Sequence, residues 1–196
     1  MEEDWMDMLT EAQKDEIGLI TTAAFAFAAH AAVGQRRKYT GEHYFNHPLA
    51  VMHLLKDHGI NDSEVLQATL LHDVLEDTQI TRHDLILAGF NSRIVAMVTE
   101  VTNVYTKERY AEFNRAERSR RECQRLADVS ANAQNIKVAD LIDNTKDIVD
   151  NDPEFAKVYL KEKEALLEAL TEADPGLRDT AYKQLRDAQE KLNDRV

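Results

Sequence analysis

The chain contains 196 residues, of which 43% are hydrophobic and 31% are charged, with only 6 Gly and 3 Pro. This length suits one well-buried core, and the composition favours helices and disfavours both β-sandwiches and disorder. The net charge of −12 argues against a general affinity for nucleic acid, because its phosphates would repel an acidic surface.

The N-terminal residues are acidic, whereas a secretory signal begins with positive charge, and the single Cys123 permits no internal disulfide. We therefore expect a cytoplasmic protein in a reducing environment. We also expect one domain over residues 1–196, with a core of about residues 10–150 and C-terminal helices over about residues 153–195. No pattern in the chain predicts an oligomeric state.

The first predicted helix spans Thr10 to Ala32 and ends at Gly34, a common C-terminal stop. Its apolar run, residues 17–33, is rich in alanine and interrupted by polar residues. The run therefore predicts a buried helix and no membrane span. One face of this helix would carry Ile17, Ile20, Ala24, Phe27, Ala28 and Ala31.

Capping signals predict the other helices. Asn46 can cap a second helix, which carries Pro48 in its first turn and runs to Gly59, and Asp62 or Ser63 can cap a third over residues 64–77. No stretch alternates convincingly enough to predict a strand, so the expected fold class is all-α, a single-domain multi-helix bundle. Later helices are expected over residues 81–89, 92–101, 107–127, 131–149, 153–172 and 175–193. The expected start residues are Thr81, Asn91 or Ser92, Ser130, Asp152 and Asp174, while the charged helix over residues 107–127 has no assigned cap.

One predicted helix crowds four ionisable groups into six residues: His72, Asp73, Glu76 and Asp77. At helical spacing His72 and Glu76 would lie one above the other on one face of the helix. Asp73 and Asp77 would do the same on the adjoining face. An imidazole beside a carboxylate offers two ligands to a divalent cation, and two carboxylates one turn later can handle a water and its protons. The alternative is a solvated helix end without chemistry.

A second apolar helix is interrupted by Lys137, Asp140 and Asn144, which share one stripe. A buried carboxylate is costly unless it is paired, so Asp140 either forms a salt bridge with Lys137 or binds a metal. His47 either bonds to a backbone group at its helix start or joins the same site. Two imidazoles and two carboxylates would suit Mn²⁺, Fe²⁺, Zn²⁺ or Ni²⁺.

Two basic segments stand out on this acidic chain and indicate local attraction for a small anion. The first is the loop segment Arg36-Arg37-Lys38, and the second lies within residues 107–125. For most arginines of the second segment the alternative is pairing with neighbouring glutamates along a helix.

The order His, His-Asp, Asp resembles the HD-domain superfamily of metal-dependent phosphohydrolases. The surrounding segments are most similar to the hydrolase domain of RelA/SpoT-type proteins, and above all to its single-domain members, the small alarmone hydrolases and the metazoan SpoT homologue. The match runs from about Ala23 to Ile148. Its segments are Gly34–Lys38, Gly41-Glu42, Tyr44, Asn46–Leu49, Leu71–Thr78, Val98–Thr102, Ile136–Asp140 and Asn144.

The resemblance implies Mn²⁺-dependent removal of the 3′-pyrophosphate from ppGpp or pppGpp, a small-molecule nucleotide substrate. It implies that Glu76 and Asp77 activate or orient the attacking water. It also implies that Arg37 and Lys38 meet substrate phosphate or base and that Asn144 contacts substrate, with Lys137 among the basic groups available to the pyrophosphate. The implied metal ligands are His47, His72, Asp73 and Asp140.

Two departures from the family pattern concern substrate selectivity. The bifunctional enzymes commonly read Ala-Asp-Arg-Leu-His-Asn where this chain has residues 139–144, so the Arg and His become Leu141 and Asp143. The basic loop is also one residue longer than the common spacing. Three alternatives follow: an HD phosphohydrolase for another nucleotide, deoxynucleotide or NADPH, a non-catalytic alarmone-binding module, and a helical structural protein.

Overall fold

The computed structural model describes residues 9–195, which form α-helices and no β-sheet. Within these residues the one strand-like pairing is an isolated antiparallel bridge between Arg36 and His43. The predicted all-α class is confirmed. The helices are α1 (Glu11–Ala32), α2 (Asn46–Asp57), α3 (Ser63–Leu70), α4 (Val74–Asp77), α5 (Arg82–Leu87), α6 (Ser92–Val101), α7 (Arg115–Ala127), α8 (Ala131–Thr145), α9 (Ile148–Asn151), α10 (Pro153–Ala169) and α11 (Pro175–Asn193).

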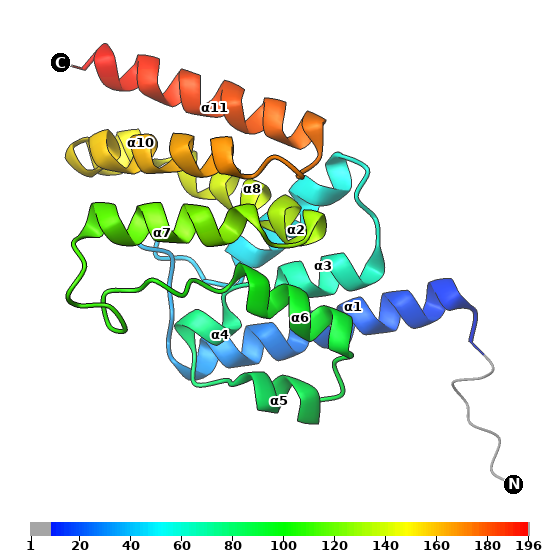
Figure 1. The fold of residues 1–196 in the computed structure, drawn as a ribbon. Coiled ribbons are helices and arrows are strands. Elements are labelled where there is room, and N and C mark those ends of the chain that lie inside the picture. Colours follow the sequence, from blue (N-terminus) through cyan, green and yellow to red (C-terminus); the bar gives the residue numbers. More distant parts are fainter. Residues whose placement is uncertain (1–8, 196) are drawn as a thin grey trace, which may run out of the picture.

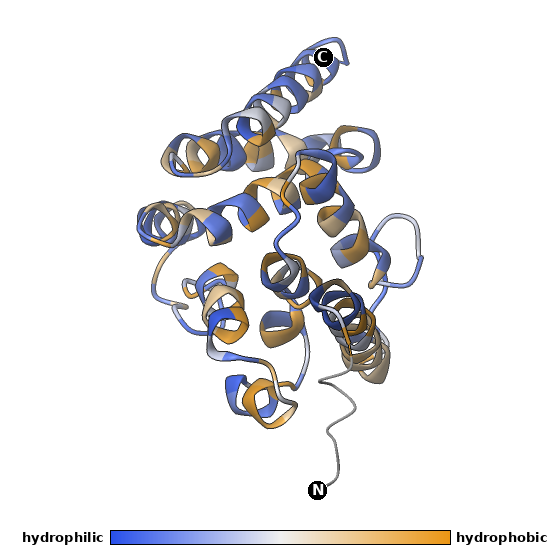
Figure 2. Ribbon diagram, turned by 90° about the vertical axis from the view of Figure 1, so that its right-hand side faces the viewer, coloured by the Kyte–Doolittle hydropathy of each residue, from blue (hydrophilic) through white to orange (hydrophobic). Residues whose placement is uncertain are grey.

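Helix α8 lies at the centre of the bundle, with α2 and α11 packed along it and α6 and α10 also in contact (Figure 1). Helices α1, α3 and α6 pack beside one another below it, and α10 and α11 form the upper edge. The apolar faces of most helices turn inward (Figure 2), with α1 and α5 as exceptions. Nearly every side chain of α8 from Ala133 to Asp143 is buried, so its polar residues must find partners inside the protein.

Helix starts follow the predicted caps with one exception. The side chains of Thr10, Asp62, Thr81 and Ser130 each accept a hydrogen bond from a backbone N–H of the first turn. The cap at Asn46 was predicted wrongly, because α2 already includes this residue and its side-chain amide donates to Glu42 instead.

The helix predicted over residues 64–77 is interrupted at the His-Asp motif. Leu71, His72 and Asp73 form a turn between α3 and α4, closed by a hydrogen bond from Val74 N to Leu71 O. Successive residues of a regular helix point about 100° apart, so the turn allows His72 and Asp73 to face the same site. The prediction of one continuous helix is therefore wrong, although the backbone N–H of Asp77 still bonds to the carbonyl oxygen of Asp73 at helical spacing.

Two other predicted boundaries differ. Helix α7 begins only at Arg115, because Asn114 caps it and residues 102–114 form a loop. The helix predicted over residues 131–149 ends at Thr145, and the short α9 follows. Both changes bring loop backbone to the edge of the site described below.

The face of α1 that the sequence predicted to be apolar and buried is largely exposed. Ile20 is 62% exposed and Phe27 is 46% exposed. The buried positions are instead Thr22, Ala26, Ala29 and His30, whose mostly small side chains let α1 approach α3 closely. None of the helices within residues 9–195 has the length and apolarity needed to cross a bilayer.

Candidate metal centre and active site

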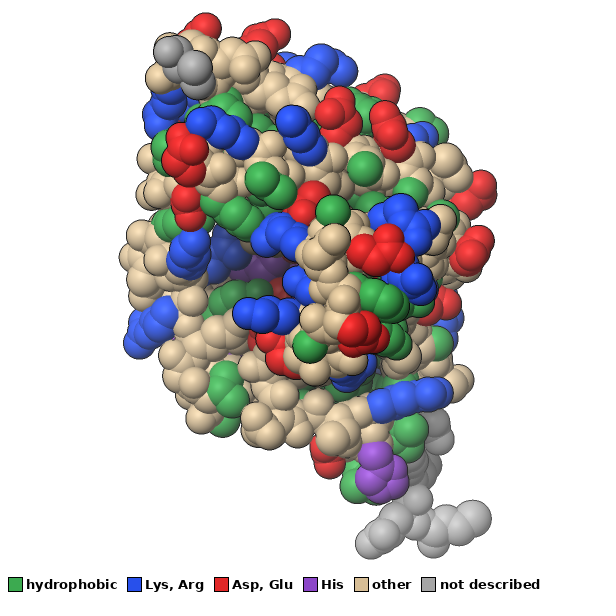
Figure 3. All heavy atoms as spheres, turned by 60° about the vertical axis from the view of Figure 1, so that its left-hand side comes forward, with side chains coloured by type: hydrophobic (Ala, Val, Ile, Leu, Met, Phe, Trp, Pro, Cys, Tyr) green, Lys and Arg blue, Asp and Glu red, His purple; other side chains and the backbone are tan. Residues whose placement is uncertain are grey.

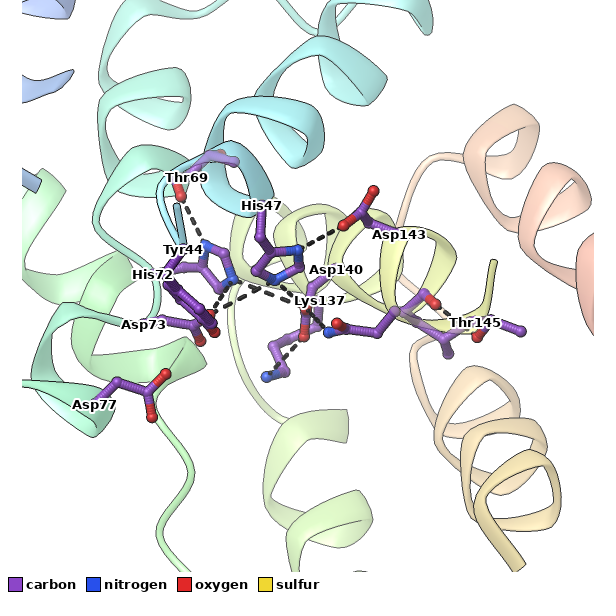
Figure 4. A network of polar contacts seen from close by, with 12 residues as sticks. Tyr44, His47, Thr69, His72, Asp73, Asp77, Lys137, Asp140, Asp143 and Thr145 are labelled. Atoms are coloured by element: carbon purple, nitrogen blue, oxygen red, sulfur yellow. Dashed lines mark hydrogen bonds and ion pairs between the residues drawn. The ribbon is translucent and has the colours of Figure 1, made fainter. Parts of the chain in front are cut away.

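Four side chains from three parts of the fold converge at one point (Figure 4). His47 comes from α2, His72 and Asp73 come from the turn after α3, and Asp140 comes from α8. One ligand atom from each of the first three lies within 4.8 Å of the others. Oδ1 of Asp140 lies 3.1 Å from His47 Nε2 and 3.8 Å from His72 Nε2. The structure thus brings together all four residues predicted as metal ligands.

The orientation of the two imidazoles fits a metal. His72 Nδ1 lies 2.8 Å from the carbonyl oxygen of Thr69, to which it donates, so Nε2 is the nitrogen that faces the cluster. This Nε2 is buried and makes no hydrogen bond, although Asp73 Oδ2 is 3.0 Å away. His47 Nδ1 lies 2.7 Å from Asp143 Oδ2, which leaves its Nε2 toward Asp140. Two imidazole nitrogens and carboxylate oxygens are a donor set for a divalent transition metal.

Charge in the cluster is balanced by close pairing. Burial would lower the pKa of His72, but in the metal-free protein Asp73 and Asp140 raise it to about 10, so a cation at Nε2 would displace a proton. Burial would raise the pKa of Asp140, but Lys137 and the two histidines hold it well below its usual range. Lys137 Nζ lies 3.4 Å from Asp140 Oδ2. The predicted salt bridge and the predicted metal role are therefore compatible, because each uses a different oxygen of Asp140.

Tyr44 is one of the residues that match the family pattern, but the sequence predicted no role for it. Its hydroxyl donates a 2.6 Å hydrogen bond to Asp73 Oδ2. Burial and the charge of Asp73 raise the pKa of Tyr44, so the hydroxyl keeps its proton. The bond fixes the carboxylate of Asp73 within the cluster.

The two carboxylates that follow the motif line the wall of the adjoining cavity. Glu76 accepts hydrogen bonds from the backbone N–H and the side-chain amide of Asn103, and Asp77 Oδ2 accepts one from Gln35 at 2.7 Å. Both side chains are exposed at the cavity surface, yet the surrounding protein desolvates their carboxylates enough to raise both pKa values. The negative charge of Asp73 raises them further.

The cavity beside the cluster has a volume of about 490 Å³, and a second chamber of about 330 Å³ adjoins it. On the surface this region is a hollow with lysine and arginine side chains around its mouth and histidine at depth (Figure 3). Volumes of this size suit a nucleotide. Five residues line both chambers, namely Glu76, Asn103, Lys137, Tyr159 and Lys163.

Lys163 was not among the predicted site residues. It lies on α10, and burial lowers the pKa of its ammonium group. Within residues 9–195 it forms no ion pair, and its ammonium lies 5.2 Å from the ring centre of Tyr159. No local sequence signal marks Lys163, because only the packing of α10 over α7 and α8 brings it to the cavity.

Some of the predicted substrate-binding residues lie on the wall of the cavity and others lie at its mouth. Arg37 donates 3.2 Å hydrogen bonds to Asn144 Oδ1 and to Asp143 Oδ2, and the Asn144 amide donates to Asp140 Oδ1 at 2.6 Å. Lys38 is 69% exposed and pairs with Asp152 at 3.2 Å. Arg37 is thus tied to the metal cluster, whereas Lys38 lies at the mouth of the cavity.

The second basic segment is mostly paired with glutamates, as its alternative interpretation predicted. Glu117 pairs with Arg120 and Arg121, and Glu122 pairs with Arg125. Arg115 lines the second chamber but forms an ion pair with Glu162, and Arg118, in the same chamber, donates to the carbonyl oxygen of Phe113.

The model of the HD domain matches residues 24–170. The chain belongs to the HD-domain family. Family membership implies a divalent metal site, and the His-Asp cluster of this HD domain is arranged for one.

Several named proteins are similar to this HD domain. Mouse guanosine-3′,5′-bis(diphosphate) 3′-pyrophosphohydrolase MESH1 is 38% identical over 124 residues, which are 62% of this chain and 65% of the mouse protein. The MESH1 protein of Xenopus tropicalis is 37% identical over 71% of this chain and 74% of its own length. A solved structure, described as a metazoan ortholog of SpoT that hydrolyses ppGpp and plays a role in starvation responses, matches with a TM-score of 0.76 and 28% identity. The match covers 89% of this chain and 96% of that one. These relatives confirm the predicted resemblance to RelA/SpoT-type hydrolases.

Proposed function

We propose that this HD domain removes the 3′-pyrophosphate of ppGpp or pppGpp with the help of Mn²⁺, giving GDP or GTP and pyrophosphate. The observation that carries the proposal is the cluster of two imidazoles and two carboxylates at the wall of a nucleotide-sized cavity that the buried Lys137 also lines. The names of the similar proteins support the choice of substrate.

In this proposal the metal ligands are His47, His72, Asp73 and Asp140, as the sequence predicted. When bound, the cation supplies Lewis acidity, which draws charge from a phosphate oxygen and makes water more acidic. The orientation of its ligands is fixed in advance by the bonds from His72 to Thr69 and from Tyr44 to Asp73.

Proton transfer is assigned to the two carboxylates next to the cluster. Glu76 accepts a proton from the attacking water, and its raised pKa brings it closer to the working pH of a general base. Asp77 orients the same water, while Gln35 holds its carboxylate in place.

Charge on the departing pyrophosphate is neutralised by basic side chains around the cavity. Lys137 and Arg37 lie next to the cluster, Lys163 lies where the two chambers meet, and Lys38 lies at the mouth. Asn144 contacts substrate beside Arg37. We also propose that residues 1–196 act as one domain, because α11 packs directly on α8, which carries Asp140.

The experiment is a hydrolysis panel in Mn²⁺ that contains ppGpp, pppGpp, NADPH, GTP and dNTPs, with EDTA as control and products separated by ion exchange. Pyrophosphate together with GDP or GTP, formed from the alarmones alone, is the expected result. Turnover of NADPH or a dNTP alone would keep the metal chemistry and refute the substrate. Binding of ppGpp without turnover would identify a non-catalytic module.

A further inference from the structure

One carboxylate, that of Asp143, contacts both the metal cluster and the basic loop of residues 35–44. Its Oδ2 lies 2.7 Å from His47 Nδ1 and 3.2 Å from Arg37 Nη2, while its Oδ1 lies 2.9 Å from Lys146 Nζ. The side chain is only 8% exposed, so these contacts replace most of its hydration. His47 and Arg37 therefore share a single acceptor atom.

The contact with His47 determines which nitrogen can bind a metal. An ionised carboxylate only accepts hydrogen bonds, so Asp143 holds the Nδ1 side of the ring, and Nε2 on the other side faces Asp140 Oδ1 at 3.1 Å. Asp143 thereby fixes the rotation of this imidazole and turns Nε2 toward the metal cluster.

The contact with Arg37 places a guanidinium on the cavity wall. A second link from Arg37 to α8 runs through Asn144 to Asp140. The same acceptor that orients His47 thus also sets the position of a group that faces the substrate phosphates.

We propose that Asp143 is a positioning residue which couples the metal centre to anion binding at Arg37, and this rests on the proposed function of the cavity. A cation that fixes His47 also fixes the carboxylate of Asp143, which holds Arg37. In the same way, an anion that fixes Arg37 fixes this carboxylate and therefore His47. Such coupling is reciprocal by thermodynamic necessity. Because Asp143 stands where the bifunctional enzymes commonly have histidine, the family resemblance does not supply this role.

The first test is calorimetric titration of the EDTA-stripped, full-length protein with Mn²⁺, without any nucleotide. Asp143→Asn keeps the size of the side chain and removes its charge, and we expect Mn²⁺ affinity to fall about 10- to 100-fold. Lys146→Gln is the matched control, because it removes the partner of the other oxygen and should leave the affinity within about twofold of wild type. Wild-type affinity in Asp143→Asn would refute the role toward His47.

The second test separates KM from kcat at saturating Mn²⁺. Arg37→Gln should raise KM for the nucleotide and lower Mn²⁺ affinity less than Asp143→Asn does, because Arg37 contacts His47 only through the shared carboxylate. Asp143→Asn should also raise KM, and the double variant should raise it no further than the larger single effect, because both substitutions disrupt one unit. Additive effects on KM would show that the two residues act independently and would overturn the coupling.

Circular dichroism and thermal melting of each metal-free variant check folding. If Asp143→Asn does not fold, Asp143→Glu takes its place, since it keeps the charge but displaces the acceptor, and the same directions are expected. If the protein binds Mn²⁺ but hydrolyses no nucleotide, the proposed function fails, and the coupling is then measured as binding of inorganic phosphate to the Mn²⁺-loaded variants. If Asp143→Asn left the affinity for inorganic phosphate unchanged, the coupling would be refuted by this measurement.

Discussion

Helices α7 and α8 both carry many polar and charged residues, but they use them in opposite ways. Glu117 on α7 pairs with Arg120 and Arg121, three and four residues further along the same helix. On α8 the polar side chains are buried, and their partners lie on α2, in the loop of residues 35–44 and in the α3–α4 turn. Charges that pair locally on a surface contribute little, whereas buried charges require partners that only the whole fold provides.

The contrast places the candidate site on the buried polar residues of α8. Asp140 and Asp143 would each be costly to bury alone, and the structure surrounds them with histidine, lysine and arginine. The Glu117 pairs on α7 could be exchanged for other polar residues without disturbing any distant element. Substitutions at the site that α8 carries should therefore have larger effects than substitution of Glu117.

The largest expected effect is that of Asp73→Ala, which removes a predicted metal ligand at the α3–α4 turn. We expect loss of both Mn²⁺ binding and hydrolysis, because the remaining groups no longer complete the site. Calorimetry with Mn²⁺ and the pyrophosphate-release assay measure the two losses. Asp187→Ala, an exposed position on α11, is the control and should behave as wild type. Hydrolysis that survives without bound metal would refute the metal mechanism.

Glu76→Gln should separate the proton transfer from the metal. The amide oxygen can still accept one of the two hydrogen bonds from Asn103, but the amide cannot accept a proton, so we expect kcat to fall by about 10²–10⁴-fold. Mn²⁺ affinity should stay near that of wild type. An undiminished kcat would remove Glu76 from the mechanism.

The pH dependence of hydrolysis should reflect the titration of Glu76. Burial, together with the charge of Asp73, raises the pKa of Glu76 above its ordinary value of 4.5. Because the base must be ionised, kcat at saturating Mn²⁺ should fall about tenfold per pH unit below this raised pKa and level off above it. The residual activity of Glu76→Gln should lack this acid limb, and an unchanged limb would assign the titration to another group.

Lys163→Met should have a smaller effect, confined to substrate binding. A hydrogen bond to a charged group contributes about 1.5–3 kcal/mol, so we expect KM to rise roughly 10- to 100-fold with Mn²⁺ affinity unchanged. Lys161→Met, on an exposed position of the same helix, is the matched control. An unchanged KM in Lys163→Met would place the substrate outside the passage between the chambers.

Glu117→Gln on α7 should have the smallest effect. Its partners Arg120 and Arg121 are more than one-third exposed, so loss of the pairs should change neither the melting temperature nor kcat/KM measurably. A clear loss of activity would show that α7 contributes more to the site than its surface pairing indicates, and would weaken the contrast with α8.

Much of the fold could be predicted from local chemistry. Caps such as Thr10 and Ser130 mark helix starts because they bond within their own first turn. The turn at residues 71–73 could not be predicted, because it interrupts an apolar segment whose periodicity continues through it. The exposed face of α1 was missed because close packing through small residues such as Ala26 replaced burial of the larger side chains.

The candidate site was predictable where a motif names its residues, as with His47, His72, Asp73 and Asp140, which the structure brings together. Tyr44, Asp143 and Lys163 take part through contacts with residues far away in sequence. Such contacts follow from packing, and no spacing in the chain encodes them.

The placement of the basic groups has a consequence for the effect of ionic strength. Lys137 is buried and Lys163 is half-buried in the cavity wall, whereas Lys38 is 69% exposed at the mouth. At 0.1 M salt, exposed charges are largely screened beyond about 10 Å, but buried charges are screened much less. Added salt should therefore slow the capture of an anionic nucleotide at the mouth more than it weakens the binding of a nucleotide already seated beside Lys137 and Lys163.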